Sequence, residues 1–243
     1  MAHILITGHS RGLGSAIAEQ LLDLGHHVLG LSRNPHRRLG KPHAQQFREL
    51  SVDLGQPQAL SAFLSTSILE DFFRSADQAL LINNAGLLTP IGPAGTLPQE
   101  RILESVTVNI AAALGLANQF IATTAACADR RIAHISSGAG RSPYAGWGVY
   151  CASKAALDHH ARCLNLELQG RCRVESIAPG IIDTGMQSQI RAASLEQFPM
   201  RPKFDQLKET GSLAPAEGVA KKLIGHLFSD AFGDSPCSDL RDF

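Results

Sequence analysis

The sequence predicts an α/β protein in which a doubly wound parallel sheet forms a single domain, residues 1–243. Short apolar runs of strand length alternate along the chain with longer segments of helical periodicity. This order favours parallel strands joined by crossover helices. Hydrophobic residues make up 44% of the chain, so a substantial core can form. No linker rich in proline, glycine or serine interrupts the alternation, and one domain is therefore the simplest organisation.

The predicted strands are short apolar runs, as expected for strands that are buried on both faces. They are His3–Ile6, His27–Leu31, Gln46–Val52, Ala79–Ile82, Arg131–Ser136 and Arg173–Ala178. Helical periodicity predicts helices between them, and Gly25 closes the first. The predicted helices are Ser15–Leu24, Pro57–Phe73, a long helix from about Pro98 to Cys127, and Gly148–Gln169.

The segment 181–215 departs from this alternation. It mixes Met186, Phe198, Met200 and Phe204 with polar residues and prolines. A long irregular segment in a compact domain is usually functional or disordered. We expect a lid over a substrate site; an ordinary surface excursion is the alternative.

Composition argues against several classes of function. The formal net charge is zero, without a basic stripe or an acidic tail, which speaks against nucleic-acid binding. The cysteines are odd in number and lack Cys-x-x-Cys spacing, so reduced thiols are expected rather than disulfides or zinc. The pair His159–His160 has no further ligand at metal spacing, and no metal is expected. No signal peptide or membrane-spanning stretch is expected either, which favours a cytoplasmic protein without a membrane partner.

A glycine-rich turn follows the first predicted strand and opens the first predicted helix. Gly8, Gly12 and Gly14 permit a tight turn whose backbone N–H groups approach a phosphate, and the helix N-terminus adds partial positive charge. A glycine-rich turn by itself is often only a turn. Its place between strand and helix predicts a dinucleotide cofactor.

The end of the second strand indicates which cofactor. Sites for NAD usually carry an acidic residue there that binds the ribose 2′-hydroxyl, whereas this chain has Ser32 and Arg33. Arg33 and Arg11 are suited to pairing with a 2′-phosphate. We therefore predict NADP, with NADPH preferred over NADH. The alternative is that both arginines are solvated surface charges.

Polar residues also end the third and fourth strands. Asp53 follows one, and Asn84, Ala85 and Gly86 follow the other. Ligands of open parallel sheets bind outside the carboxyl ends of the strands, so these residues are expected near the adenosine half of the cofactor. Taken alone, each is equally compatible with a turn.

A second group of residues predicts the reaction. Tyr150 and Lys154 lie four residues apart on a predicted helix and therefore share a face. A cation beside a phenol lowers its pKa, so we expect Lys154 to tune Tyr150 for proton transfer to or from a substrate oxygen. Ser137, at the end of the fifth strand, is placed to hydrogen-bond that oxygen. Such a pair alone is common as plain packing; with Ser137 and the glycine turn it predicts catalysis.

In these motifs the chain resembles the short-chain dehydrogenase/reductase family over nearly its full length. The matching pieces are Thr7–Gly14, Asp53, Asn83–Gly86, Asn109, Ser136-Ser137, Tyr150 with Lys154, Pro179-Gly180 and Thr184. The resemblance implies a Rossmann-like fold, with Tyr150 as acid/base, Ser137 orienting the substrate, Lys154 binding the nicotinamide ribose and Asn109 maintaining a proton relay. The residues expected to bind cofactor are Gly8, Ser10, Arg11, Gly12, Leu13, Gly14, Ser32, Arg33, Asp53, Leu54, Asn84, Ala85, Gly86, Tyr150, Lys154, Pro179, Gly180, Ile182 and Thr184.

The segments 84–92, 179–187 and 237–243 resemble the branch of sepiapterin and benzil reductases, which implies reduction of a carbonyl flanked by a second carbonyl. Expected substrate contacts are Ser137, Leu87, Ala139, Tyr144, Trp147, Tyr150 and Ile181, with Leu88, Ile182 and Phe198 as further candidates; several of these are equally compatible with core positions. A mostly apolar wall suits a hydrophobic carbonyl compound.

The predicted helices around Val106 and Ala155 are apolar on nearly every side, so beyond the sheet they have surface for a partner. We expect a homodimer or homotetramer. Two other functions stay open: an alcohol dehydrogenase that works oxidatively, and a cofactor-binding sensor with little turnover. The intact catalytic set argues against the sensor.

Overall fold

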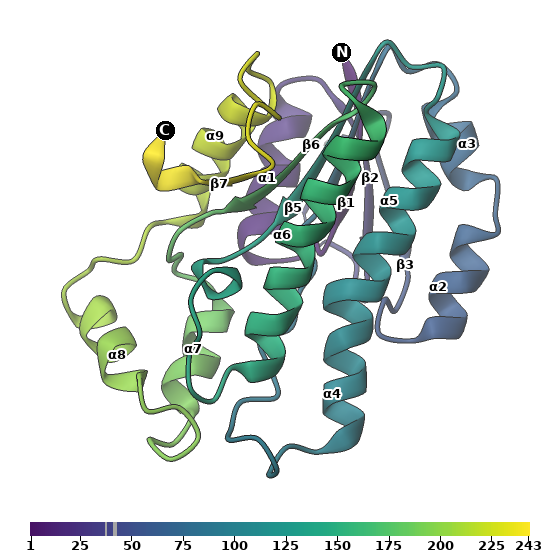
Figure 1. Cartoon of the computed structure of the whole chain (residues 1–243). Helices are drawn as coiled ribbons and strands as arrows, with labels where there is room; N and C mark the ends of the chain where they lie inside the picture. Colours follow the sequence, from purple (N-terminus) through teal and green to yellow (C-terminus); the bar gives the residue numbers. More distant parts are fainter. Residues whose placement is uncertain (37, 41–42) are drawn as a thin grey trace.

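A computed structural model describes residues 1–36, 38–40 and 43–243. The strands form one parallel sheet in the order β3-β2-β1-β4-β5-β6-β7, with the reversal of order between β1 and β4 (Figure 1). The strands are β1 (Ala2–Thr7), β2 (His27–Ser32), β3 (Phe47–Ser51), β4 (Gln78–Asn83), β5 (Asp129–Ile135), β6 (Arg173–Ala178) and β7 (Cys237–Asp239). The predicted doubly wound sheet is therefore confirmed.

Helices cover both faces of the sheet, and each face has its own apolar core. On one face α1 and α9 pack together, with Ile17 and Leu223 fully buried between them and the strands. On the other face α2, α3, α5 and α6 cover the strands, with Phe120 fully buried. The helices are α1 (Gly12–Asp23), α2 (Pro57–Leu64), α3 (Ile68–Phe73), α4 (Gln99–Val106), α5 (Ala112–Thr123), α6 (Gly148–Leu168), α7 (Gly185–Ala192), α8 (Arg201–Glu209) and α9 (Ala216–Leu227).

The helix predicted for Pro57–Phe73 is two helices, α2 and α3. The break falls on Ser65, Thr66 and Ser67. The Ser65 hydroxyl donates to the Ser61 carbonyl at 2.9 Å, and the Thr66 hydroxyl donates to the Phe63 carbonyl at 2.7 Å. Short polar side chains that bond nearby carbonyls compete with helical backbone bonds, which accounts for the end of α2.

The long helix predicted from Pro98 is present but not uniform. Between α4 and α5 lies a π-helical segment, Thr107–Ala111, which contains Asn109. The whole helix, Gln99–Thr123, is long and apolar enough to cross a membrane, contrary to the expectation from sequence. Its apolar character has a different physical reason here, because α5 packs on the sheet beside β4, with Leu116 and Phe120 fully buried. Length and composition alone are thus weak grounds for a membrane span.

The segment 181–215 is not irregular as predicted, since it contains α7 and α8. Figure 1 shows both helices apart from the helix layers that cover the sheet. They enclose a third, smaller apolar cluster with Trp147, Phe198 and Phe204. The structure also contains α9, β7 and a short 3₁₀ turn at Leu240–Asp242, which the sequence did not predict.

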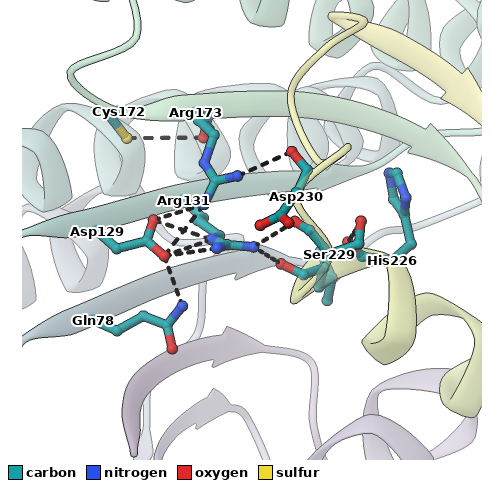
Figure 2. Close-up of polar contacts among 9 residues, drawn as sticks. Gln78, Asp129, Arg131, Cys172, Arg173, His226, Ser229 and Asp230 are labelled. Atoms are coloured by element: carbon teal, nitrogen blue, oxygen red, sulfur yellow. Dashed lines mark hydrogen bonds and ion pairs between the residues drawn. The ribbon is translucent and has the colours of Figure 1, made fainter.

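The amino-terminal edge of the sheet is held by a network of charges around Asp129 (Figure 2). Its carboxylate accepts hydrogen bonds from Arg131, Arg173 and Gln78. Burial acts to raise the pKa of Asp129, but these bonds outweigh it and lower the value to about 2. Arg131 also donates to the Leu227 carbonyl at 2.6 Å, which ties the end of α9 to β5. The opposite, carboxyl edge is left for ligands.

Candidate active site

A cavity of about 520 Å³ runs along the carboxyl edge of the sheet. It joins the glycine turn, the ends of β2 to β6, and residues of α6, α7, α8 and the C-terminal segment. The structure brings the predicted cofactor and substrate residues to its wall, with Phe198 as the exception; the predicted catalytic residue Asn109 is not on the described wall either. The predicted residues on the wall include Gly8, Ser10, Arg11, Gly12, Leu13, Gly14, Ser32, Arg33, Asp53, Leu54, Asn84, Ala85, Gly86, Leu87, Ser137, Ala139, Tyr144, Trp147, Tyr150, Lys154, Pro179, Gly180, Ile181, Ile182 and Thr184.

The glycine turn has the geometry of a phosphate cradle. Gly8 and Gly12 adopt positive φ values of 70° and 57°, which favour glycine. A Cβ at Gly14 would lie 2.2 Å from the Gly8 carbonyl oxygen, so only glycine lets α1 start this close to β1. The turn thus presents backbone at the N-terminus of α1 to the cavity, a chemistry that fits a dinucleotide phosphate.

Asn84 ties this turn to the end of β4. Its side-chain amide donates to the carbonyls of Thr7 at 2.9 Å and Gly8 at 3.2 Å. In return the Thr7 hydroxyl accepts the backbone N–H groups of Asn84 and Ala85. The side chain therefore fixes two strand ends, and residues 84–86 line the cavity. Asn83 points elsewhere, toward His134 and the Ala113 carbonyl.

The far end of the cavity carries the residues expected to select the cofactor. The Arg33 side chain is half exposed, and its Nη1 lies 3.8 Å from a Glu104 carboxylate oxygen. The carbonyl of Arg33 accepts the Ser51 hydroxyl at 3.0 Å, which holds the backbone at this point. Asp53 lies nearby and accepts the N–H of Gly55 at 3.0 Å. A guanidinium with one long contact is available for a phosphate.

Ser137, Tyr150 and Lys154 meet at the middle of the cavity. The Lys154 ammonium donates to the Ile135 carbonyl at 2.7 Å and lies 5.6 Å from the centre of the Tyr150 ring. Ser137 follows β5, and its hydroxyl oxygen accepts the N–H of Ala139 at 3.2 Å. Tyr150 and Lys154 are both buried, at 6% and 4% exposure, so their charges are poorly screened.

The ionisation of Tyr150 differs from the prediction that Lys154 lowers its pKa. Burial raises the pKa of Tyr150 to about 12, which a hydrogen bond from Ser137 only partly opposes. Burial also lowers the pKa of Lys154 to about 8, against the attraction of Asp158. For both side chains, burial therefore changes the pKa more than the neighbouring groups do. At neutral pH the pair is a protonated phenol beside a charged amine, which is the state of a proton donor.

Asn109 lies behind this group rather than on the described cavity wall. Its side-chain oxygen accepts the N–H of Leu87 at 2.7 Å, and its amide donates to the Leu87 carbonyl at 2.8 Å. A Cβ at Gly86 would lie 3.5 Å from both Asn109 Oδ1 and Lys154 Nζ, so the two side chains flank the same glycine. The π-helical segment around Asn109 is typical of functional positions in helices.

The reacting end of the cavity has an aromatic wall. Tyr144 and Trp147 line it, with ring centroids 5.3 Å apart. Phe198, a further candidate, is fully buried and instead supports Trp147 from behind, stacked at 4.4 Å. The position of Phe198 follows from packing of the 181–215 segment, which sequence periodicity does not reveal.

Several lining residues were missed by the sequence reading. They come from α7, α8 and the C-terminal segment, and include Met186, Gln187, Gln189, Ile190, Lys203, Phe204, Asp239 and Arg241. None sits at the end of a predicted strand; Asp239 ends β7, which the sequence did not predict. The chain returns across the cavity only in three dimensions. The available signals were the mixture of large apolar residues with prolines in 181–215 and the resemblance of segments 179–187 and 237–243 to the branch of sepiapterin and benzil reductases.

The arrangement is suited to redox chemistry at a carbon–oxygen bond. The buried Tyr150 hydroxyl is placed to protonate an oxygen held by Ser137, with the positive charge of Lys154 beside it. A nucleotide phosphate fits the glycine turn at the other end of the same cavity. These two halves together are what an enzyme needs to reduce a carbonyl with a nicotinamide cofactor.

Comparison with known proteins agrees with this chemistry. The family model for "short chain dehydrogenase" matches residues 2–195. Benzil reductase ((S)-benzoin forming) of Bacillus cereus is 36% identical, over 96% of each chain. Sepiapterin reductase of Mus musculus is 32% identical, over 98% of this chain and 96% of that one. A crystal structure of a short-chain dehydrogenase/reductase from Burkholderia vietnamiensis has 36% identity and a TM-score of 0.72, over 100% of this chain and 98% of that one.

The family match covers well over half of the chain, and the similarity to the reductases extends along nearly all of it. The protein is an oxidoreductase, its cavity is of the kind that binds a nicotinamide cofactor, and the chain belongs to the short-chain dehydrogenase/reductase family.

Proposed function

We propose that the protein reduces a ketone with NADPH and that Tyr150 is the general acid. The observation that carries the proposal is the meeting of Ser137, Tyr150 and Lys154 in the cavity that also contains the glycine turn. The nicotinamide cofactor supplies the hydride when it is bound. The side chains of this chain bind and orient both partners and supply the proton.

Each catalytic side chain has a separate role in this reduction. Ser137 donates a hydrogen bond to the carbonyl oxygen and fixes its position. Tyr150 gives its hydroxyl proton to the same oxygen as negative charge develops there. Lys154 holds the ribose and, by its charge, stabilises the tyrosinate that is left. A tyrosine whose pKa is raised to about 12 is protonated at neutral pH, which supports reduction over the oxidative direction.

The preference for NADPH rests on Arg11 and Arg33. Both line the cavity, Arg11 in the glycine turn and Arg33 directly after β2, where Ser32 stands in place of an acidic residue. A guanidinium pairs well with a 2′-phosphate, whereas an acid would repel it. Glu104 lies 3.8 Å from Arg33 and holds its side chain. Glu104 does not belong to the described cavity wall, so that wall stays free for the phosphate.

The proposed substrate is a hydrophobic 1,2-dicarbonyl compound. Tyr144, Trp147 and Ile181 give the reacting end a mostly apolar wall. The relatives reported above are named for the reduction of benzil and sepiapterin, which supports this class. The segment 181–215 closes over this end as a lid, since α7 and α8 contribute Met186, Ile190 and Phe204 to the wall.

Location and assembly are further parts of the proposal. The free cysteines Cys127, Cys151, Cys163, Cys172 and Cys237 suit a reducing compartment, which favours the cytoplasm. The exposed apolar side chains of Leu103 on α4 and Leu166 on α6 favour a homodimer or homotetramer formed through these helices.

The test is the loss of NADPH absorbance with a panel of 1,2-diketones, simple ketones, aldehydes and pterin carbonyls. We expect turnover on diketones or pterins, and little on simple ketones, because a second carbonyl activates the first. NADPH that binds tightly without turnover on any of these compounds would favour a cofactor-binding sensor. Faster oxidation of the corresponding alcohols at neutral pH would favour the oxidative enzyme.

A further inference from the structure

A buried carboxylate lies behind the catalytic group, on the same helix. Asp158 follows Lys154 by one turn and Tyr150 by two turns on α6, and it is only 2% exposed. Residues four apart on a helix share a face, so Asp158 continues the line of the two catalytic side chains away from the cavity. A buried charge is costly unless it is paired and hydrogen-bonded, so its retention here calls for partners and a role.

Three side chains from three different segments satisfy this carboxylate. Its Oδ1 accepts two hydrogen bonds. One comes from the hydroxyl of Ser136, which follows β5, at 2.6 Å, and the other from the hydroxyl of Ser176 on β6, at 2.7 Å. Its Oδ2 accepts Nε of Arg141 at 3.2 Å. Arg141 in turn donates to the Ser238 carbonyl at 2.8 Å, in the C-terminal segment that lines the cavity. Asp158 thus joins α6 to the end of β5, to β6 and, through Arg141, to the C-terminal segment.

The contact with Ser136 bears directly on catalysis. Ser136 precedes Ser137 in the chain, and its own N–H donates to the Ile177 carbonyl at 2.8 Å. On the other side of Ser136, the Ile135 carbonyl accepts the Lys154 ammonium. The Asp158–Ser136 bond therefore fixes Ser136 between its two neighbours in the chain. Ser137 is the residue proposed to orient the substrate, and the Ile135 carbonyl holds Lys154.

The charge of Asp158 also acts on Lys154. Burial lowers the pKa of Lys154 to about 8, and the attraction of Asp158 opposes that change. On the opposite side His134, on β5, is held neutral at neutral pH because its pKa is lowered to about 3 by burial. Around Asp158 itself the titratable or charged groups are Arg141, the Cys237 thiol on β7 and, farther out, Arg162 and Glu175.

We propose that Asp158 is a positioning residue of the active site, whose buried carboxylate fixes the strand end that carries Ser137 and places a negative charge one helical turn from Lys154. The catalytic meaning of this role rests on the proposed function, because a charged Lys154 matters only if Tyr150 donates a proton. The electrostatic part is separate from turnover and is measurable in the resting protein. It predicts a residue that affects activity without contacting cofactor or substrate.

The experiment is an NMR titration of the lysine side chains in protein labelled at lysine Cε. Lys154→Met identifies the Lys154 signal. We expect its midpoint at about 8 in the wild type. In Asp158→Asn the midpoint should fall by about one pH unit or more, as expected when an opposite charge within a few ångströms is removed in a poorly screened site. Glu175→Gln is the matched control, because it neutralises another buried carboxylate on β6 and should leave the Lys154 midpoint in place.

Two further variants separate the two parts of the role. Ser136→Ala keeps the charge of Asp158, so the Lys154 midpoint should stay while kcat for reduction falls and KM for NADPH does not change. Arg141→Gln removes the cation that competes for Asp158, so the midpoint should rise. The side chain of Arg141 is one-third exposed, which keeps this variant informative if Asp158→Asn does not fold.

The proposal would be overturned if the titration midpoint of Lys154 did not change in Asp158→Asn, or if it did not rise in Arg141→Gln. If the midpoints move as expected and the wild type reduces no carbonyl compound, the proposed function fails and the electrostatic role of Asp158 stands. If the wild type is active, the alkaline limb of its kcat/KM profile should move with the Lys154 midpoint in each variant.

Discussion

At the level of single residues, the charge on Lys154 sets the pH range in which the site can work. Burial lowers the pKa of Lys154 to about 8, so the amine is charged below that value and loses its charge as the pH rises through it. Tyr150, with a pKa raised to about 12, stays protonated throughout this range. We expect kcat/KM for reduction to decline above about pH 8. A profile that stays flat well above that pH would show that Lys154 does not assist Tyr150.

Arg33 is expected to select the cofactor in the same local way. In Arg33→Asp, a carboxylate would repel the 2′-phosphate and could accept a ribose hydroxyl. We expect the ratio of kcat/KM for NADPH over NADH to fall by ~10-fold or more, which corresponds to the loss of one charge-assisted hydrogen bond. Arg74→Asp makes the same charge change on α3, far from the cavity, and should leave the ratio unchanged. An unaltered ratio in Arg33→Asp would remove the basis for NADPH preference.

At the level of elements, we expect the proposed lid to depend on the stack between Trp147 and Phe198. Phe198 is fully buried, and its ring lies parallel to Trp147 with an interplanar angle of 9°. Phe198→Ala should lower the free energy of unfolding by about 3–5 kcal/mol in urea titrations, as large-to-small changes in a core do. Because Trp147 loses its support, KM for the carbonyl compound should rise while KM for NADPH does not change. A rise in both KM values would mean that α7 and α8 do not form a separate substrate lid.

Elements that carry motifs were predictable, whereas elements that depend on tertiary packing were not. Thr7 and Asn83 end strands, and Asp53 and Ser137 lie two residues beyond strand ends. A parallel sheet must bring such residues to one edge. The helices of 181–215 are short, and their buried apolar residues pack in a cluster with Leu88, Trp147 and Tyr150, which are distant in the sequence, so a local apolar pattern does not predict them. The sequence could not predict the π-helical segment at Asn109 either, because a π-helical segment changes the backbone hydrogen bonds without changing the pattern of apolar residues.

Ionisation was predicted less well than position. The spacing of Tyr150 and Lys154 correctly implies a shared helix face, but it does not reveal how deeply both side chains are buried. Desolvation then reverses the expected direction for Tyr150. Asp158 was overlooked for the same reason, because in the sequence it is one more polar residue on a helix.

At the level of the whole molecule, the apolar faces of α4 and α6 are the expected site of self-association. Leu103 and Leu166 are 58% and 77% exposed, and the two helices pack side by side (Figure 1). Light scattering should give a mass of two or four chains for the wild type. Leu103→Glu with Leu166→Glu should lower that mass, whereas Leu24→Glu, an exposed leucine after α1, should not. A monomeric wild type would contradict the expected assembly.

The measurement that tests the central claim most directly compares Tyr150→Phe with the wild type, in both NADPH binding and turnover of the best diketone. The substitution removes only the hydroxyl that is proposed to donate the proton. Turnover should fall at least ~10²-fold, as for the loss of a general acid, while the dissociation constant for NADPH stays within a factor of about two. Turnover in Tyr150→Phe close to that of the wild type would contradict the assignment of Tyr150 as the acid, and with it the proposed mechanism.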